Sequence, residues 1–286
     1  MLISGFTFIK NAQILGYPFI ESIKSVLPIV DEFVVNVGKS EDDTLSLVKK
    51  INDPKIKIIE SDWNEKMTDK GYVYGQQKMI AQFNCNGKWA FYIEADEIYH
   101  EKEIFRIRDA VSEIDKNKII EALAFNFIHF YGNTNTYLDS PGWYRSEVRI
   151  IRNNIRTYAP DGLFWLVLKT NKIARYPFAK KIAVTCYHYG WVRGEDQMNL
   201  KSEKVQKYWN KTHSNISYEN IDPSILRLFE GQHPKIMQTL LSQSKGLFKT
   251  NPNYRISSKQ KKHRFMKAIE NIFKVDLSKR HFKLVK

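Results

Sequence analysis

The chain contains 286 residues, of which 43% are hydrophobic and 13% aromatic, and its formal net charge is +14. This length and apolar content exclude a disordered chain and suffice for one large domain or two small ones with a sizeable core. The excess positive charge predicts an acidic partner: a nucleic acid, an anionic membrane or a substrate such as a nucleotide diphosphate.

The first part of the chain alternates strands and helices. Apolar runs predict strands at residues 6–9, 33–37 and 56–59, with helices at 19–25 and 45–51 between them. Strand–helix–strand–helix–strand at this spacing predicts right-handed βαβ units and a parallel sheet. Because the carboxyl ends of parallel strands meet at one edge, the polar segments 36–43, 62 and 94–97 are expected to converge there.

Residues 89–101 carry the clearest chemical signal. The apolar run WAFYI stops abruptly at Glu94, Asp96 and Glu97. A buried strand that ends in carboxylates places them at the rim of a sheet, where they suit a divalent cation and, through it, a diphosphate. The simpler interpretation is a strand that runs into a solvated acidic turn. No GxGxxG follows the first strand and no GxxxxGK[ST] occurs, so a glycine-rich phosphate cradle has no support.

The pattern changes beyond a helix predicted at 104–114 and a strand at 122–128. Residues 129–195 are rich in aromatic residues, Arg and His, with short apolar runs at 147–151, 164–168 and 182–187. These runs predict short, less regular antiparallel strands of the kind that shape the pocket of a second substrate. A long amphipathic helix is expected at 196–209.

Together these segments resemble a bacterial family 2 glycosyltransferase of the GT-A fold, in a branch associated with cell-surface polysaccharide and lipopolysaccharide. The resemblance runs from about Gly5 to His233 and rests on FIKN at 8–11, VGKSEDDT at 37–44, WAFYIEADEIYHE at 89–101, WYRSEVRI at 143–150 and HYGWVR at 188–193. It implies an α/β fold with a mostly parallel central sheet flanked by helices, a mixed acceptor-side segment and a helical C-terminal region. The implied division is a nucleotide-sugar-binding half at 1–125, an acceptor-side half at 126–245 and a basic tail at 246–286.

The resemblance also implies the donor site. Glu94, Ala95 and Asp96 stand at the place of the family's Asp-x-Asp motif, so Asp96 and the later His188 are expected to hold Mn²⁺ or Mg²⁺ against the diphosphate of a nucleotide-sugar donor. Glu94 is one methylene longer than the family's Asp, which favours contact with the ribose or a water. The alternative for His188 is a buried histidine with satisfied hydrogen bonds. The other residues expected to bind the nucleotide sugar are Phe8, Lys10, Asn11, Asn36, Gly38, Asp42, Asp62 and Lys78.

An inverting transferase needs a general base for the acceptor hydroxyl. Asp161, Glu97 and Glu147 are the candidates, and Asp161 is favoured because its loop at 158–162 is open to an acceptor, although Pro160-Asp161-Gly162 is also an ideal turn sequence. Ion pairs are the alternative role for the arginines near the expected acceptor site, and core packing is the alternative for the tryptophans. The residues expected to bind a saccharide or lipid-linked acceptor are Trp143, Arg145, Glu147, Arg149, Trp191 and Arg193.

The positive charge is concentrated near the C-terminus. Residues 255–286 contain eleven Lys or Arg against two acids, Glu270 and Asp276. Residues 259–273 predict a basic amphipathic helix, which suggests peripheral contact of 255–286 with an anionic membrane, or else a helix packed on the domain with a solvated basic face. The apolar positions on one side of this helix are Phe265, Met266, Ile269, Ile272 and Phe273.

The expected location is cytoplasmic, with contact at the inner face of the cell membrane. No apolar run approaches the roughly 20 residues that span a bilayer, the N-terminus lacks the features of a signal peptide, and Cys85 and Cys186 cannot form a disulfide framework. Two other functions stay open. A nucleic-acid-binding protein explains the charge but not the acidic strand ends, which repel phosphate. A GT-A fold kept for binding alone is suggested by Glu94 and by Ala12, where the family has Glu.

Overall fold

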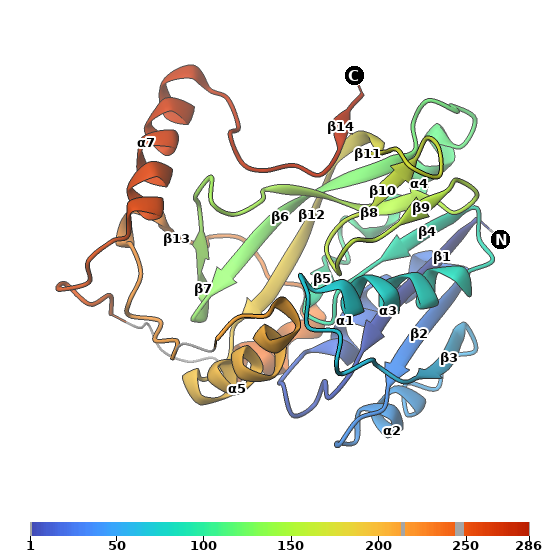
Figure 1. The fold of residues 1–286 in the computed structure, drawn as a ribbon, viewed down its shortest axis with the longest axis horizontal. Coiled ribbons are helices and arrows are strands. Elements are labelled where there is room, and N and C mark those ends of the chain that lie inside the picture. Colours follow the sequence, from blue (N-terminus) through green and yellow to red (C-terminus); the bar gives the residue numbers. More distant parts are fainter. Residues whose placement is uncertain (1, 213–214, 244–248, 286) are drawn as a thin grey trace.

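The computed structural model describes residues 2–212, 215–243 and 249–285, and Figure 1 shows the arrangement of their helices and strands. The strands are β1 (Ile3–Ile9), β2 (Glu32–Gly38), β3 (Ile56–Ser61), β4 (Trp89–Tyr92), β5 (Glu97–Tyr99), β6 (Ala122–Tyr131), β7 (Asn133–Leu138), β8 (Ser146–Arg152), β9 (Thr157–Tyr158), β10 (Leu166–Leu168), β11 (Ala174–Arg175), β12 (Phe178–Trp191), β13 (Leu226–Leu228) and β14 (Lys283–Leu284). The α-helices are α1 (Phe19–Val26), α2 (Thr44–Lys49), α3 (Tyr72–Phe83), α4 (Ile104–Ile114), α5 (Glu195–Gln206), α6 (Gln238–Gln243) and α7 (Ser258–Phe273). Four 3₁₀ turns span Leu27–Ile29, Lys207–Trp209, Pro223–Ile225 and Lys235–Met237.

Most of the strands join one sheet, which follows the order β13-β7-β6-β8-β4-β1-β2-β3. The neighbours β4, β1, β2 and β3 are parallel, while β8 pairs antiparallel with both β4 and β6. The long strand β12 also pairs with β6, in parallel, and carries β5 and β14 as further partners. In Figure 1 the parallel strands lie at the right, and β7, β13 and α7 lie at the left. The expected α/β fold, with a parallel half, a mixed half and flanking helices, is confirmed.

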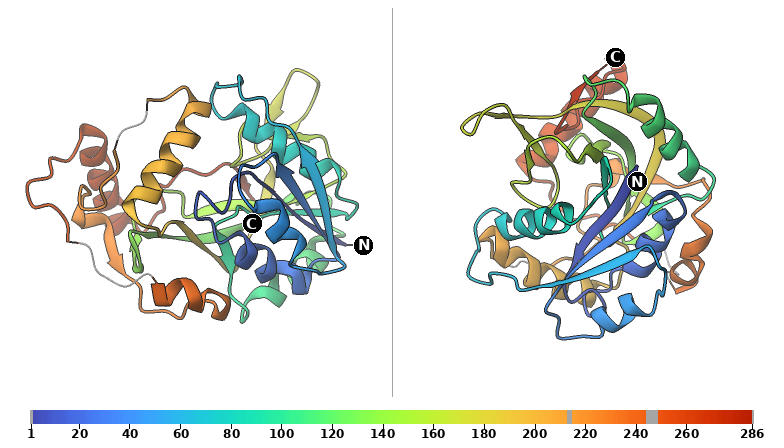
Figure 2. Two further views of the ribbon diagram at one scale, coloured as in Figure 1. Left: turned by 90° about the horizontal axis from the view of Figure 1, so that it is seen from below. Right: turned by 90° about the vertical axis from the view of Figure 1, so that its right-hand side faces the viewer.

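Helices cover both faces of the parallel half, as the two views of Figure 2 show. On one face, apolar side chains of α1, α2 and α4 pack against β1, β2 and β4 in the larger core cluster. On the other face, α3 and the segment between β9 and β10, through Ala159 and Trp165, pack in a second cluster that contains Phe6 and Val34. All seven residues of β1 and of β2 are buried, as expected of parallel strands covered on both sides.

The structure confirms two of the three short antiparallel strands expected within residues 129–195, at β8 and β10, and corrects the third. The run at 182–187 is part of β12, which is 14 residues long and runs parallel to β6. Register shifts between Lys181 and Thr185 and between His188 and Trp191 interrupt its pairing with β6. Such bulges break the two-residue alternation by which a long strand is recognised in a sequence. The helix expected at 196–209 is α5, which passes into the 3₁₀ turn at Lys207–Trp209.

Three further expectations concern the chain as a whole. The boundary expected between residues 125 and 126 falls inside β6, and the boundary between 245 and 246 lies outside the described residues, so the division into halves and a tail stays a prediction. Cys85 and Cys186 are both buried and unpaired. Among the described residues, no helix combines the length and apolar character needed to cross a membrane.

The core should respond strongly to truncation of Phe125. This ring is fully buried, stacks on Phe91 at 5.7 Å between centroids and meets Tyr99 edge-on at 5.5 Å. We expect Phe125→Ala to lower the free energy of unfolding by about 3–5 kcal/mol, measured by urea denaturation, because it leaves a cavity in the larger cluster. The matched control is Phe83→Ala, since Phe83 is 75% exposed and its loss should change stability by less than about 0.5 kcal/mol. Equal losses in the two variants would contradict this account of the core.

Candidate functional site

A cavity of about 870 Å³ opens at the carboxyl ends of β1, β2, β3 and β4. Its walls come from the segments that follow these strands, from the loop around Asp161, and from α5 with the turn after it. The expected convergence of the polar strand ends is therefore confirmed. The volume falls within the range of about 300–1,000 Å³ typical of sites for small ligands.

Glu94, Asp96 and His188 form a cluster in this cavity. Each offers one oxygen or nitrogen atom, and these atoms lie within 4.8 Å of one another. Glu94 and Asp96 stand in the turn between β4 and β5, and His188 reaches them because β12 pairs with β5 at the step His188–Glu97. Gly190 leaves the room that the cluster needs, since a Cβ there would lie 2.6 Å from the His188 ring.

Positive side chains surround Asp96. Lys201 Nζ lies 3.2 Å from Asp96 Oδ2, and Arg193 lies 3.7 Å from the same oxygen. Burial alone would raise the pKa of Asp96, but Lys201, Arg193 and His188 in its protonated form outweigh it and hold that pKa well below its usual range. Burial also lowers the pKa of Lys201 to about 8. Asp96 is therefore ionised whenever the protein is folded near neutral pH.

The pKa of Glu94 is raised, whereas that of Asp96 is lowered. Burial and the neighbouring charge of Glu97 raise the pKa of Glu94 to about 7, against the pull of Arg149. Arg149 Nη2 lies 3.2 Å from Glu94 Oε1, and the backbone N–H of Glu94 donates to Glu97 Oε2 at 3.1 Å. The cluster thus holds one firmly ionised carboxylate and one whose ionised form lacks sufficient positive charge nearby.

A hydrogen-bonded histidine pair sets the orientation of His188. His129 Nε2 lies 2.7 Å from the carbonyl oxygen of Tyr144, which can only accept, so this nitrogen carries a proton. Burial lowers the pKa of His129 to about 3, so its Nδ1 carries no proton and accepts from His188 Nδ1, 2.9 Å away. The proton of a neutral His188 therefore sits on Nδ1, and its Nε2 lone pair faces Asp96.

The residues of the cluster fit a divalent cation. His188 Nε2 and Asp96 Oδ1 lie 3.4 Å apart, and when neither carries a proton two acceptors face each other without a donor between them. A cation close to both atoms removes this conflict, and it also supplies the positive charge that ionised Glu94 lacks. Two carboxylates and an imidazole are a donor set suited to Mn²⁺ or Mg²⁺. Lys201 lies against the other oxygen of Asp96, so it leaves Oδ1 free for this role.

The structure brings nine of the residues expected at the site to the cavity wall. Phe8 stacks on Tyr92 with ring centroids 5.9 Å apart, and Asn11, at a φ of 53°, accepts a hydrogen bond from the backbone of Glu41. Lys10 pairs with Glu65 across the cavity mouth. The nine residues are Phe8, Lys10, Asn11, Asp62, Glu94, Ala95, Asp96, Asp161 and His188.

Three other residues expected to contact the nucleotide-sugar donor lie outside the cavity lining and hold its walls in place. Asn36 is fully buried and donates to Gln77. Asp42 accepts from the backbone N–H groups of Ile14 and Thr44, which ties the ends of the first two strands together. Gly38 packs directly on a ring, because a Cβ there would lie 2.4 Å from an atom of Trp63. Direct contact of these three with a nucleotide stays a prediction.

Lys78 supports the loop that carries Asp161. The Lys78 side chain is fully buried, its Nζ donates to the carbonyl oxygens of Gly162 and Leu163 at 3.1 Å each, and it lies 3.6 Å from the centroid of the Trp165 ring. Burial lowers the pKa of Lys78 below its usual value. Asp161 itself lines the cavity and accepts from the backbone N–H of Leu163 at 2.8 Å, so it is held but accessible.

The other two candidates for a general base are enclosed. Glu97 is fully buried, where Arg149 donates to it from Nε at 2.8 Å and from Nη2 at 2.5 Å. Glu147 is fully buried as well, 2.5 Å from Nδ1 of His281. Neither residue lines the cavity, whereas Asp161 does. Accessibility therefore favours Asp161 of the three.

The residues expected to bind an acceptor are dispersed. Trp143 and Trp191 line a second, smaller cavity of about 320 Å³. Arg145 pairs with Glu270 of α7, while Arg149 holds Glu97 beneath the cluster. Arg193 alone of the arginines lies near Asp96, and it also donates to the carbonyl oxygen of Leu15. Their contact with an acceptor stays a prediction.

Sequence reasoning missed a row of lysines on the cavity wall. Lys201, Lys204 and Lys207 recur every three residues along α5 and the turn after it, and all three line the cavity. Lys204 pairs with Glu41 at 3.4 Å and Lys207 with Glu65 at 2.7 Å. The spacing placed the three on one side of a helix, but it did not show that this side faces the strand ends.

Replacing His129 should weaken metal binding without touching a metal ligand. We expect His129→Phe to lower Mn²⁺ affinity about 10–100-fold, because it removes the acceptor that fixes the His188 ring. His129→Gln, whose amide can accept from His188 and donate to Tyr144, should restore part of the affinity. Mn²⁺ titrations followed by electron paramagnetic resonance measure both variants. Unchanged affinity in a folded His129→Phe protein would contradict the role given to the histidine pair.

Comparison with known proteins gives structural matches alone. No family model matches the chain, and no curated protein does. One similar solved structure is TarS of S. aureus, with 18% identity and a TM-score of 0.39 over 71% of this chain and 39% of that chain. Another is residues 1–349 of S. aureus TarS in complex with UDP, with 16% identity and a TM-score of 0.40 over 72% of this chain and 64% of that chain. A third is glucosyl-3-phosphoglycerate synthase from Mycobacterium tuberculosis in complex with Mn²⁺, UDP and phosphoglyceric acid, with 16% identity and a TM-score of 0.33 over 44% of this chain and 43% of that chain. The chain thus spans less than two thirds of the length of each of these structures, and its function is argued from its own geometry.

Proposed function

We propose that this protein transfers a sugar from a nucleotide-diphosphate sugar to a saccharide or lipid-linked acceptor, with inversion and with Mn²⁺ or Mg²⁺ as cofactor. The observation that carries the proposal is the cluster of Glu94, Asp96 and His188 in a cavity of about 870 Å³ at the carboxyl ends of parallel strands. Ligands of α/β proteins bind at this edge of the sheet. A carboxylate–histidine cluster there suits a cation and hence a diphosphate.

The side chains around the cluster suit the parts of such a donor. Phe8, Asn11 and Asp62 line the cavity at the ends of β1 and β3 and are proposed to hold the nucleoside. The lysine row of α5 supplies positive charge for the phosphates. Asp96, His188 and Glu94 would hold the cation, which when bound offsets the negative charge that develops on the diphosphate.

Asp161 is proposed as the general base. As the acceptor hydroxyl oxygen bonds to the anomeric carbon, the bond from that carbon to the diphosphate oxygen breaks with its electron pair. Asp161 then takes the proton that the acceptor oxygen loses. Lys78 and the turn at Leu163 hold this carboxylate at the cavity wall.

The second candidate is a fold of the same kind that binds a nucleotide without turning it over. The observation in its favour is that protein cations already accompany both carboxylates, since Lys201 lies 3.2 Å from Asp96 and Arg149 lies 3.2 Å from Glu94. Such a protein binds a nucleotide without a requirement for metal and releases no nucleoside diphosphate from any donor sugar.

Nucleoside diphosphates should stabilise the protein in a metal-dependent way. We expect UDP, GDP, CDP or dTDP to raise the melting temperature with Mn²⁺ present by several degrees more than with EDTA, because a ligand at about 100 times its Kd adds about 2.7 kcal/mol. The Asp96→Asn protein should lose this metal-dependent increment while keeping its fold. Stabilisation that is equal with Mn²⁺ and EDTA favours the second candidate, and none with any nucleotide contradicts both.

Asp161→Asn should separate donor binding from turnover. With a donor that stabilises the wild type, we expect the nucleotide-dependent thermal shift of Asp161→Asn to persist. The kcat for release of the nucleoside diphosphate should fall about 10²–10⁴-fold, which is the rate contribution typical of a general base. Glu113→Gln is the control, because Glu113 is an exposed carboxylate outside the cavity. A kcat that is unchanged in Asp161→Asn would remove this residue from the mechanism.

A further inference from the structure

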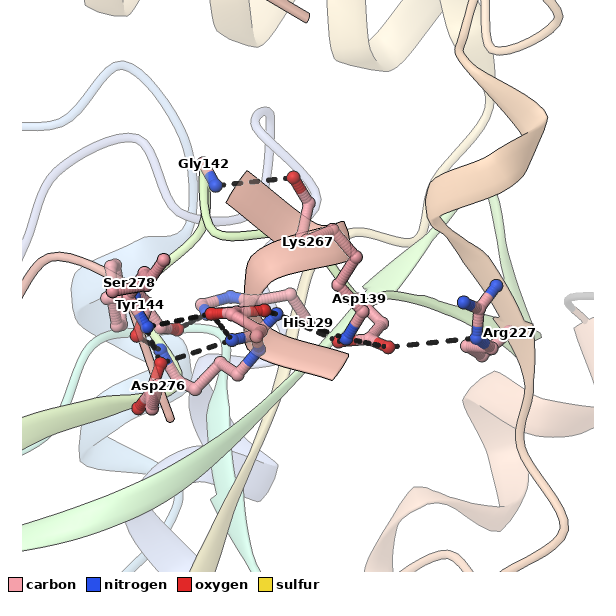
Figure 3. A network of polar contacts seen from close by, with 12 residues as sticks. His129, Asp139, Gly142, Tyr144, Arg227, Lys267, Asp276 and Ser278 are labelled. Atoms are coloured by element: carbon pink, nitrogen blue, oxygen red, sulfur yellow. Dashed lines mark hydrogen bonds and ion pairs between the residues drawn. The ribbon is translucent and has the colours of Figure 1, made fainter. Parts of the chain in front are cut away.

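The C-terminal helix α7 is attached to the rest of the protein through its polar side. Arg145 donates to both carboxylate oxygens of Glu270, at 2.7 and 3.0 Å, and Glu270 is only 6% exposed. Lys267 lies 2.7 Å from Asp139, which Figure 3 shows between Lys267 and Arg227. One turn before Lys267, Arg264 donates to Asp222 at 2.7 Å.

The opposite side of α7 is apolar and points away from the body. Phe265 is 68% exposed, Ile272 is 72% exposed and Phe273 is 68% exposed. At about 100° per residue, Phe265 and Ile272 lie on one side of the helix and Lys267 and Glu270 on the other. Shortly after the helix, Val275 and Leu277 are also exposed, by 46% and 37%.

This orientation is the reverse of what an ordinary surface helix adopts. Such a helix buries its apolar stripe and leaves its charges in water, because the hydrophobic effect dominates. Here the charges are used for attachment, and Phe265, Ile272 and Phe273 remain in water while Met266 and Ile269 are half-buried. A contiguous exposed apolar surface of this kind marks a site of contact with a protein or a membrane.

Free positive charges border the apolar stripe. Lys261, Lys262 and Lys274 form no ion pair with any residue in the described ranges, whereas Arg264 and Lys267 do. An apolar centre flanked by free lysines matches the surface of an anionic bilayer, where acyl chains lie beneath phosphate groups. A second copy of the chain would instead bring two basic surfaces together, so like charges oppose that pairing.

We propose that the outward face of α7 lies in the surface of a membrane containing anionic lipid, with Phe265, Ile272 and Phe273 among the acyl chains and the lysines at the phosphates. The polar contacts to the body stay in place, so the helix does not need to detach. This docking is independent of glycosyl transfer, because none of its residues lines the large cavity.

Sedimentation with lipid vesicles tests the proposal on the full chain. The wild type is expected to bind vesicles of phosphatidylcholine with phosphatidylglycerol, to bind phosphatidylcholine alone much more weakly, and to dissociate as salt rises. The triple variant Phe265→Ser, Ile272→Ser, Phe273→Ser should lose at least about tenfold in affinity for the anionic vesicles. Its melting temperature should remain that of the wild type, because these side chains already face water.

The matched control is the triple variant Phe83→Ser, Phe105→Ser, Ile119→Ser. These residues are 75%, 62% and 67% exposed and lie on or beside α3 and α4, so the control removes a similar apolar surface elsewhere. It should bind anionic vesicles as the wild type does. Failure of the wild type to bind, or equal losses in both triple variants, overturns the proposal. So does a dimer, detected by light scattering, that forms through Phe265, Ile272 and Phe273 while vesicles stay unbound.

Discussion

The buried ion pair between Arg149 and Glu97 is the interaction on which the rest of the site depends. Neither side chain is exposed, and the pair joins β8 of the mixed half to β5, directly after the turn that carries Glu94 and Asp96. Arg149 also reaches Glu94, and Glu97 accepts from the backbone of Glu94. Removing one partner of such a pair leaves an uncompensated buried charge, which typically costs about 3–5 kcal/mol. The ion pair thus fixes the shape of the turn that presents the two cavity carboxylates.

The cluster is assembled from both halves of the sheet. The parallel half supplies Glu94 and Asp96 at the end of β4, and the mixed half supplies His188 from β12. β5 directly follows this turn and pairs with β12, which sets the distance between the carboxylates and His188, and the hydrogen bond from His188 to His129 sets the orientation of the His188 ring. A site shared in this way is complete only when the two halves are correctly paired, which couples the chemistry of the cluster to the fold.

Local patterns in the sequence predicted the elements, but not the partners of buried charges. The apolar periodicity located α4 at its observed ends, and the resemblance singled out Asp96 and His188, which the structure brings together. Arg149 and Glu97 were expected to contact an acceptor and to act as a base, yet they neutralise each other in the core. Lys201 was overlooked because α5 reaches Asp96 only through tertiary packing, 105 residues along the chain. Spacing reveals neighbours on one element, whereas ion pairs between elements depend on the finished fold.

The same limit applies to α7, where the sequence showed two faces but not which one would attach. Attachment through the polar face is possible because the body offers acceptors at matching positions: Asp139 for Lys267 and Asp222 for Arg264, with Arg145 as the donor to Glu270. Several such pairs, partly shielded from water and sharing partners, hold the helix more firmly than isolated surface pairs, which contribute about 0–1 kcal/mol each. The apolar face is thereby held outward, where it has no partner within the described chain. Covering this face of α7 with another apolar surface would lower the free energy of the system, because it removes apolar side chains from water. The free lysines beside it favour an anionic surface as the partner.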